Sequence, residues 1–273
     1  MKYEDFKKLL NKVIYSDGEE NYSLLLKIIK EPHRYCGLFR LSNGRSKLLQ
    51  NVTQSREIKF GDFLEYLVTE YFSLCNYDNL SKDLGYDEKR KRLLVDQIFI
   101  KNNELYFIEQ KVRDDHDSTK KEGQFRNFIK KYERIKEKYP NIKIHGIMWF
   151  IDSSLSKNER YYSREISDHS DKNLKLFYGN QLFDYLNIPY VWEELINHLQ
   201  TIRDGNNEEI IDIPDFDTSE EIYEELVKLP KNLWDKLNSN EEIYKILRAE
   251  IFPTEYNLER AGIARDLKRK KKL

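Results

Sequence analysis

Two short runs of β-forming residues constrain the fold of this chain more than any other feature. Leu93–Ile100 and Leu105–Val112 are rich in apolar residues, and the four polar residues Lys101–Glu104 separate them. This pattern predicts a β-hairpin. A helix is expected before the hairpin, over Lys59–Tyr77, because apolar residues recur there at helical spacing.

The segments that follow predict that the hairpin belongs to a larger sheet. Thr119–Tyr139 has the pattern of an amphipathic helix, and Ile142–Ile151 is apolar enough for a central strand. A short strand is expected at Leu174–Tyr178, with two helices between residues 180 and 203. We therefore predict an α/β fold with a mixed central β-sheet flanked by helices and a mostly helical C-terminal part.

Three charged residues, Asp96, Glu109 and Lys111, stand within these apolar runs. A charge in such a place is costly unless something compensates it. Side chains alternate along a strand, so Glu109 and Lys111 project from one face, and hairpin pairing is expected to bring Asp96, near the middle of its strand, beside Glu109. Two convergent carboxylates suit Mg²⁺, and an adjacent lysine can orient or activate an attacking water or neutralise charge on a phosphorane.

On Asp96 and Glu109-Gln110-Lys111, in the order helix, strand, hairpin, strand, helix, strand, the chain resembles the PD-(D/E)xK nuclease superfamily, in particular its type II restriction endonucleases. The resemblance covers Lys59–Ile151 by architecture. Residues 108–121 are similar to the catalytic strand and following loop of such enzymes, and residues 177–186 more loosely resemble a later segment. The chain departs from the motif at Val95, where the family has Pro.

The resemblance implies that Asp96 and Glu109 bind Mg²⁺, that the backbone carbonyl of Gln110 is a further ligand and that Lys111 assists the nucleophilic water. Glu65 resembles a helical Glu that many members add, and Gln124 is a candidate for the same neighbourhood. The alternative for the hairpin residues is a structural ion-pair cluster on an exposed strand face. For Glu65 the alternative is a solvated charge at the helix edge.

The charge balance neither requires nor excludes a nucleic-acid partner. The 273 residues include 47 Lys and Arg and 48 Asp and Glu, net −1, so a polyanion site needs an uneven distribution of charge. Residues 85–143 carry 16 bases and 11 acids, net +5; residues 203–259 carry 6 and 16, net −10; and residues 260–273 carry 7 and 1, net +6. A solvated helical surface is the ordinary explanation for the acidic stretch.

Two basic clusters flank the predicted catalytic strands and are candidates for phosphate contacts. A third segment mixes amide, guanidinium and aromatic side chains, which are residue types that read base edges. Each cluster is alternatively ordinary surface charge, and the tail, Lys268–Lys272, is a phosphate contact or a frayed helix end. The DNA-contact candidates are Lys89, Arg90, Lys91, Arg92, Lys120, Lys121, Gln124, Arg126, Asn158, Arg160 and Arg164.

Composition and missing motifs exclude several other classes. No run approaches the ~18 apolar residues of a membrane span, and Met1–Lys8 does not have the pattern of a signal peptide. Cys36 and Cys75 lack the spacing of a zinc site, so free thiols in the cytoplasm are expected. The abundance of Phe, Tyr and Trp excludes disorder. No P-loop, dinucleotide-binding or serine-hydrolase motif occurs, so no nucleotide cofactor is expected.

We therefore predict an N-terminal helical region (1–58), a nuclease core (59–203) and a helical C-terminal region packed on the core (204–273). The predicted function is Mg²⁺-dependent cleavage of double-stranded DNA at a short sequence by a cytoplasmic homodimer, since two-fold symmetry lets two active sites address both strands. The alternatives are a DNA repair or recombination nuclease of the same superfamily and a non-catalytic DNA-binding protein.

Overall fold

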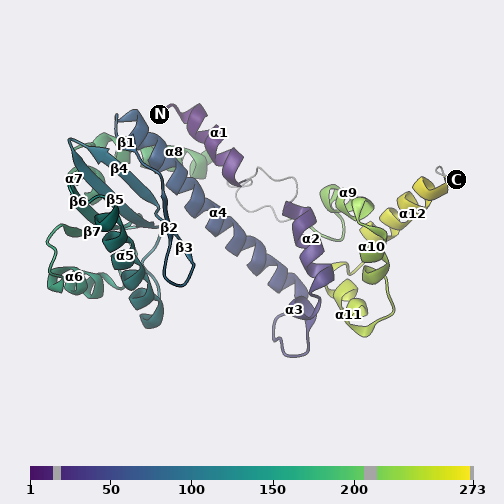
Figure 1. The fold of residues 1–273 in the computed structure, drawn as a ribbon. Coiled ribbons are helices and arrows are strands. Elements are labelled where there is room, and N and C mark those ends of the chain that lie inside the picture. The colour runs from purple at the N-terminus through teal and green to yellow at the C-terminus, as the bar shows by residue number, and fades with distance from the viewer. Residues whose placement is uncertain (15–19, 206–213, 271–273) are drawn as a thin grey trace. The chain divides into compact units, whose positions relative to one another are not determined.

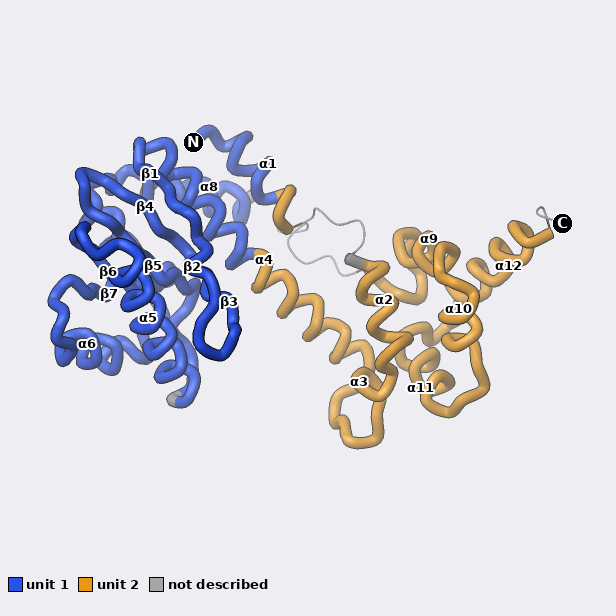
Figure 2. The backbone as a smooth tube through the Cα atoms, viewed as in Figure 1, with its two compact units in different colours: residues 1–10, 60–205 blue, residues 11–59, 206–273 orange. Residues whose placement is uncertain are grey.

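The computed structural model (Figure 1) describes residues 1–14, 20–205 and 214–270. The chain forms two compact units (Figure 2): unit 1 contains residues 1–10 and 60–205, and unit 2 contains residues 11–59 and those after 205. The predicted division at 58/59 and 203/204 stays a prediction. Among the described residues, no helix combines the length and apolarity needed to cross a bilayer.

Unit 1 is built on a mixed five-stranded sheet, which confirms the predicted fold class. Its strands run in the order β1 (Asp78–Asn79), β4 (Gln97–Lys101), β5 (Glu104–Lys111), β6 (Lys143–Phe150) and β7 (Leu174–Tyr178). β4 pairs antiparallel with β1 and β5, whereas β6 pairs parallel with β5 and β7. A separate two-stranded sheet joins β2 (Asp83–Tyr86) and β3 (Arg92–Leu94).

The predicted hairpin is β4–β5. Lys101 pairs with Glu104, so Asn102 and Asn103 form the turn, with φ angles of 52° and 61°. A two-residue turn of this kind needs positive φ at both central positions, and Asn accepts that conformation better than most residues. The turn sequence therefore determines the register, which places Gln97 opposite Ile108.

The first run of the hairpin is not one strand, contrary to the prediction for Leu93–Ile100. It divides into β3, which pairs with β2, and β4, which pairs with β1 and β5, because the chain changes sheets at Val95 and Asp96. Asp96 therefore lies in a bend at the start of β4 rather than in the middle of a strand. There its carboxylate is free of the ladder and accepts a hydrogen bond from the backbone N–H of Gln110 at 2.8 Å.

Helix α5 (Ser118–Lys138) is the crossover between the parallel strands β5 and β6. Asp117 caps its first turn, accepting a hydrogen bond from the backbone N–H of Lys120 at 2.9 Å. Its apolar side packs on the sheet. Gly146 on β6 permits this close packing, since a Cβ there would lie 2.8 Å from the Tyr132 ring.

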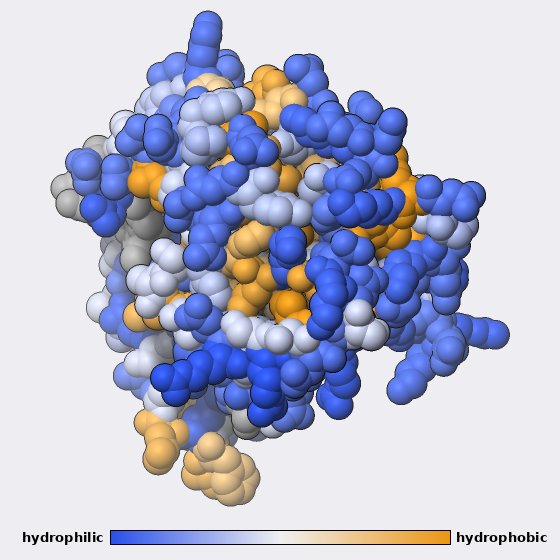
Figure 3. Space-filling view, turned by 90° about the vertical axis from the view of Figure 1, so that its left-hand side faces the viewer, coloured by the Kyte–Doolittle hydropathy of each residue, from blue (hydrophilic) through white to orange (hydrophobic). Residues whose placement is uncertain are grey.

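Helix α4 (Gly44–Leu74) begins fifteen residues earlier than the predicted Lys59 and ends before Tyr77. Its buried side chains in unit 1 include Phe63, Leu64, Leu67 and Val68. The other helices of unit 1 are α6 (Glu159–Asp168), α7 (Gln181–Tyr185) and α8 (Pro189–Gly205), together with most of α1 (Tyr3–Ile14). On the face of unit 1 seen in Figure 3, hydrophilic side chains dominate and apolar ones show between them.

Unit 2 is helical, and its core joins the two ends of the chain. Side chains from residues 24–52 and 216–261 form one buried apolar cluster. Besides the first part of α4 and the end of α1, its helices are α2 (Glu20–Lys30), α3 (His33–Cys36), α9 (Glu220–Lys228), α10 (Lys231–Leu237), α11 (Glu242–Ile251) and α12 (Tyr256–Lys270). Both cysteines are free thiols. Residues 203–207 have the composition of a linker, but α8 extends to Gly205, and 206–207 lie outside the described residues.

Candidate active site

The Lys111 ammonium lies among three oxygen atoms at the end of β5. Its Nζ is 3.0 Å from Asp96 Oδ2, 3.0 Å from Glu109 Oε1 and 2.9 Å from the backbone oxygen of Gln110. Burial lowers the pKa of Lys111, but the Glu109 and Asp96 carboxylates outweigh burial and leave the pKa raised. The ammonium is therefore protonated at neutral pH, and the four residues of the motif lie together.

A second lysine, Lys131 of α5, binds the other oxygen of Glu109. Its Nζ is 2.6 Å from Glu109 Oε2, and the two side chains are only 7% and 5% exposed. Sequence analysis missed Lys131. Its position in the helix could have indicated it. Lys131 lies on the buried side of α5 with Phe128, Tyr132 and Ile135, where an apolar residue is expected.

Glu65 of α4 is a partly buried carboxylate paired with Lys82. Lys82 Nζ is 2.7 Å from Glu65 Oε1 and also donates to Thr69 Oγ1 at 3.1 Å. Burial raises the pKa of Glu65, Lys82 opposes this change, and the charge of Asp96 raises the pKa further. Glu65 is therefore close enough to Asp96 for their charges to interact, which a freely solvated helix-edge residue would not be.

Gln97, which sequence analysis also missed, fastens α4 to the hairpin. Its Nε2 donates to the backbone oxygen of Glu65 at 2.8 Å and to Gln110 Oε1 at 3.3 Å, and its Oε1 accepts from Thr69 Oγ1 at 2.8 Å. At 1% exposure its amide depends on these bonds. The signal in the sequence was an amide residue at the start of an otherwise apolar strand.

The oxygen atoms around Lys111 are donors of the kind that Mg²⁺ takes: two carboxylates and a backbone carbonyl. They already surround a positive charge, so the donor set fits a cation. Over the ranges 1–14, 20–205 and 214–270, no group of three or more His, Cys, Asp and Glu side chains is arranged to hold a metal. A cation here would thus need the Gln110 carbonyl in addition to Asp96 and Glu109.

Comparison with known proteins covers the same region. The family model described as "Type II restriction endonuclease, HinfI" matches residues 74–203, which include the sheet, α5 and the Asp96–Glu109–Lys111 group. Over these residues the chain is similar to the HinfI family of type II restriction endonucleases. This similarity confirms the resemblance to type II restriction endonucleases.

A curated relative in this family is the type II restriction enzyme HinfI of Haemophilus influenzae. It is 24% identical to this chain over 186 residues, which are 60% of this chain and 66% of that enzyme. The match thus spans slightly less than two thirds of the relative's length. No solved structure matches the chain.

The predicted DNA-contact residues have different surroundings. Lys89, Arg90 and Lys91 are exposed in the β2–β3 turn, where their neighbour Asp87 accepts hydrogen bonds from two backbone N–H groups and pairs with Lys130 at 2.5 Å. Other exposed candidates are Lys120, Arg126, Arg160 and Arg164.

The remaining candidates are engaged in contacts within the protein. Arg92 Nη2 is 2.8 Å from Asp83 Oδ2, Lys121 Nζ lies 4.8 Å from the centre of the Tyr161 ring, and Gln124 Oε1 accepts from the Tyr162 hydroxyl at 2.9 Å. No contact between Gln124 and the Lys111 group occurs among the described interactions.

Asn158 is a correction to the sequence analysis, because it is buried and does not present its amide to solvent. Its Nδ2 donates to Asp114 Oδ1 at 2.8 Å and to the backbone oxygen of His116 at 3.1 Å. Asp114 itself has no exposed surface, and it also accepts a hydrogen bond from the Tyr178 hydroxyl at 2.9 Å. A buried acid needs such partners, and they occupy Asn158.

Proposed function

We propose that this chain is a Mg²⁺-dependent restriction endonuclease that hydrolyses phosphodiester bonds in both strands of duplex DNA at a short specific sequence. Similarity to the HinfI family of type II restriction endonucleases supports the reaction class. The observation that carries the proposal is that Asp96, Glu109 and the Gln110 carbonyl each lie 2.9–3.0 Å from the Lys111 ammonium.

Asp96, Glu109 and the Gln110 carbonyl would hold Mg²⁺ in this proposal. Such a cation, when bound, polarises a phosphate oxygen and stabilises the charge of the transition state. The Lys111 ammonium orients the attacking water or neutralises the charge that develops on the phosphorane. Lys131 fixes the direction of the Glu109 carboxylate, and Glu65 lies close enough to Asp96 for their charges to interact.

The cleavage assay uses unmethylated phage DNA with Mg²⁺ and sequences the fragment ends. Discrete bands with one shared end sequence are expected. Cutting confined to branched or damaged DNA would instead indicate a repair or recombination nuclease. Binding of duplex DNA without any cutting would indicate a non-catalytic DNA-binding protein.

Asp96→Ala and Lys111→Met test the site in the same assay. Each should lower cleavage by at least about a hundredfold, since loss of one transition-state charge partner costs about 3–4 kcal/mol. Glu133→Ala, an exposed acid on α5, should cut like the unchanged protein. Lys111→Met should still bind Mn²⁺ in calorimetry, because the ammonium no longer competes for the same oxygens. Normal turnover by either site variant would show that the assignment is wrong.

We further propose that the protein acts in the cytoplasm as a homodimer and needs no nucleotide cofactor. The two free thiols agree with a reducing compartment. Two copies would supply one active site for each strand of a symmetric target.

A further inference from the structure

A basic stretch outside the candidate active site lies in unit 2. Residues 27–59 carry eight bases and two acids, net +6. They comprise the second half of α2, the short α3, a connecting loop and the first part of α4. This charge density exceeds that of residues 85–143, which have net +5 over a longer stretch.

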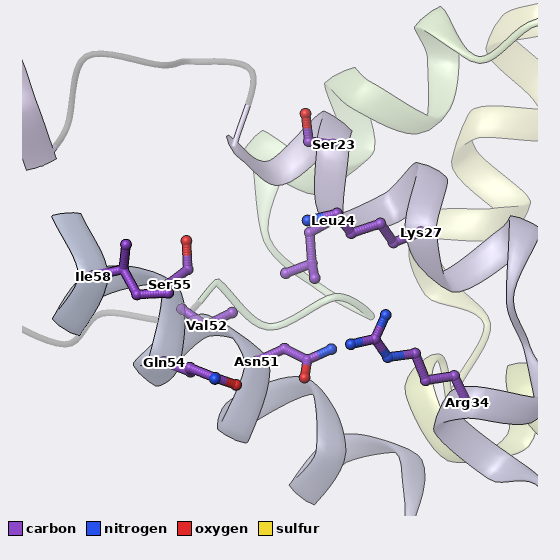
Figure 4. Close-up of a pocket in the computed structure, with 9 residues that line it drawn as sticks. All are labelled: Ser23, Leu24, Lys27, Arg34, Asn51, Val52, Gln54, Ser55 and Ile58. Atoms are coloured by element: carbon purple, nitrogen blue, oxygen red, sulfur yellow. The ribbon is translucent and has the colours of Figure 1, made fainter. Parts of the chain in front are cut away.

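A pocket gathers polar and apolar side chains from all three of these helices (Figure 4). Lys27 comes from α2, Arg34 from α3, and Asn51 and Gln54 from α4, around a volume of about 240 Å³. Figure 4 shows Arg34 extending toward Asn51. Arg34 pairs with Glu31 at 3.2 Å, but both side chains are more than half exposed, so the pair contributes little and can be exchanged for a phosphate.

The loop between α3 and α4 ends in an apolar tip with a base inside it. Leu38, Phe39 and Leu41 are 91%, 100% and 110% exposed, and Arg40 lies between them. Large apolar side chains with this exposure mark a surface that a partner covers. Proteins that bind DNA in the minor groove insert apolar side chains next to arginines in this way.

We infer that residues 27–59 form a second DNA-contact surface, which recognises duplex DNA apart from the active site; the inference rests on the proposed function. Lys27, Arg34 and Arg40 hold phosphates, and Gln54 presents an amide that suits a base edge. Asn51 lies beside them but donates its Nδ2 to the buried Tyr35 hydroxyl at 2.9 Å. The tip enters the minor groove. A second copy of the chain is the less favourable occupant, because a two-fold contact would bring like charges together.

The proposed contacts with DNA phosphates are tested with the triple variant Lys27→Gln, Arg34→Gln, Arg40→Gln. Binding to a fluorescent duplex is measured by anisotropy over a series of salt concentrations, in EDTA to prevent cutting. We expect at least tenfold weaker binding and a log K against log[salt] slope that is shallower by about 2 to 3, since each lost phosphate contact removes about 0.9. Arg40→Gln alone, in an exposed loop, should reduce the slope by about 0.9.

The matched control is Lys228→Gln, Lys231→Gln, Lys245→Gln, which removes three exposed lysines of the same unit. It should leave affinity and slope unchanged. If the triple variant and Arg40→Gln both bind like the control, the inference is overturned. If the unchanged protein neither binds nor cuts duplex DNA, the proposed function itself fails.

The apolar tip is tested with Phe39→Ser, Leu41→Ser. We expect weaker binding with an unchanged salt slope, because apolar contacts release no counterions. Sedimentation without DNA measures the oligomeric state of the same variant. Normal DNA affinity together with dissociation of a wild-type dimer would make the tip an interface between copies and overturn its assignment to DNA.

Discussion

At the scale of the residue, Glu109 shows how one site meets both folding and chemical demands. A carboxylate that is 5% exposed needs compensation, and two lysines provide it, one on each oxygen. Lys111 is 28% exposed, whereas Lys131 is 7% exposed. The outer lysine is therefore available for chemistry, and the inner lysine fixes the direction of the carboxylate.

Replacing Lys131 should thus destabilise the fold as well as lower activity. Breaking a buried pair costs about 3–5 kcal/mol, and Lys111 still compensates Glu109, so we expect about 2–3 kcal/mol for Lys131→Met in urea unfolding. Arg134→Met is the matched control: this base of the same helix is 47% exposed and pairs with Glu137, which is 66% exposed, so its loss should cost less than about 1 kcal/mol. Equal losses for the two variants would contradict a special role for Lys131.

At the scale of the element, Glu104 ties the start of β5 to the start of β6. Its carboxylate accepts from Lys143 Nζ at 2.7 Å and lies 2.8 Å from His145 Nε2, while His145 Nδ1 is 3.0 Å from the Tyr185 hydroxyl. The hydrogen bond from Lys143 is the main cause, with that from His145 next, of the lowering of the Glu104 pKa to about 2. This end of the parallel pair lies opposite the end that carries Lys111.

Because the pKa of Glu104 is lowered in the folded protein, its contribution to stability decreases in acid. The Glu104 contribution is complete above its ordinary pKa of 4.5 and is lost as the pH falls from there toward about 2. Glu104→Gln should therefore lower Tm by about 2–4 °C at pH 7, and by progressively less between pH 4.5 and 3. Thermal melts check this, with Glu137→Gln on α5 as an exposed control. A Tm difference that does not shrink in acid would exclude the Glu104 charge as its source.

At the scale of the whole molecule, the proposed dimer determines how a plasmid is cut. Each chain has one Lys111 group, so cutting both strands in a single encounter needs two chains. Light scattering should give a mass of twice 33.1 kDa, and the unchanged protein should convert supercoiled plasmid to the linear form with little nicked intermediate. Mixed dimers of unchanged and Asp96→Ala chains should yield mainly nicked circles. A monomeric mass together with full linearisation by the mixture would contradict the dimer.

Local patterns in the sequence determined the elements and the class of the protein. The alternation of apolar residues, the Asn102-Asn103 turn and the helical spacing of α5 follow from short-range stereochemistry, and they predicted the mixed sheet and its hairpin. The Asp96 and Glu109-Gln110-Lys111 motif lies within this region, so family resemblance was readable from residues close in the chain.

Only the tertiary structure decided which distant residues meet. Lys131 reaches Glu109 from 22 residues away and Asn158 reaches Asp114 from 44 residues away, and periodicity does not encode such contacts. The break at Asp96 likewise depends on which strands β3 and β4 pair with, a choice made by sheet assembly. Helix α4 begins at Gly44 because its first part packs in the core of unit 2, where Leu48 and Val52 are buried. Burial and strand pairing arise only when the whole chain assembles, so local propensity could not predict where these side chains lie.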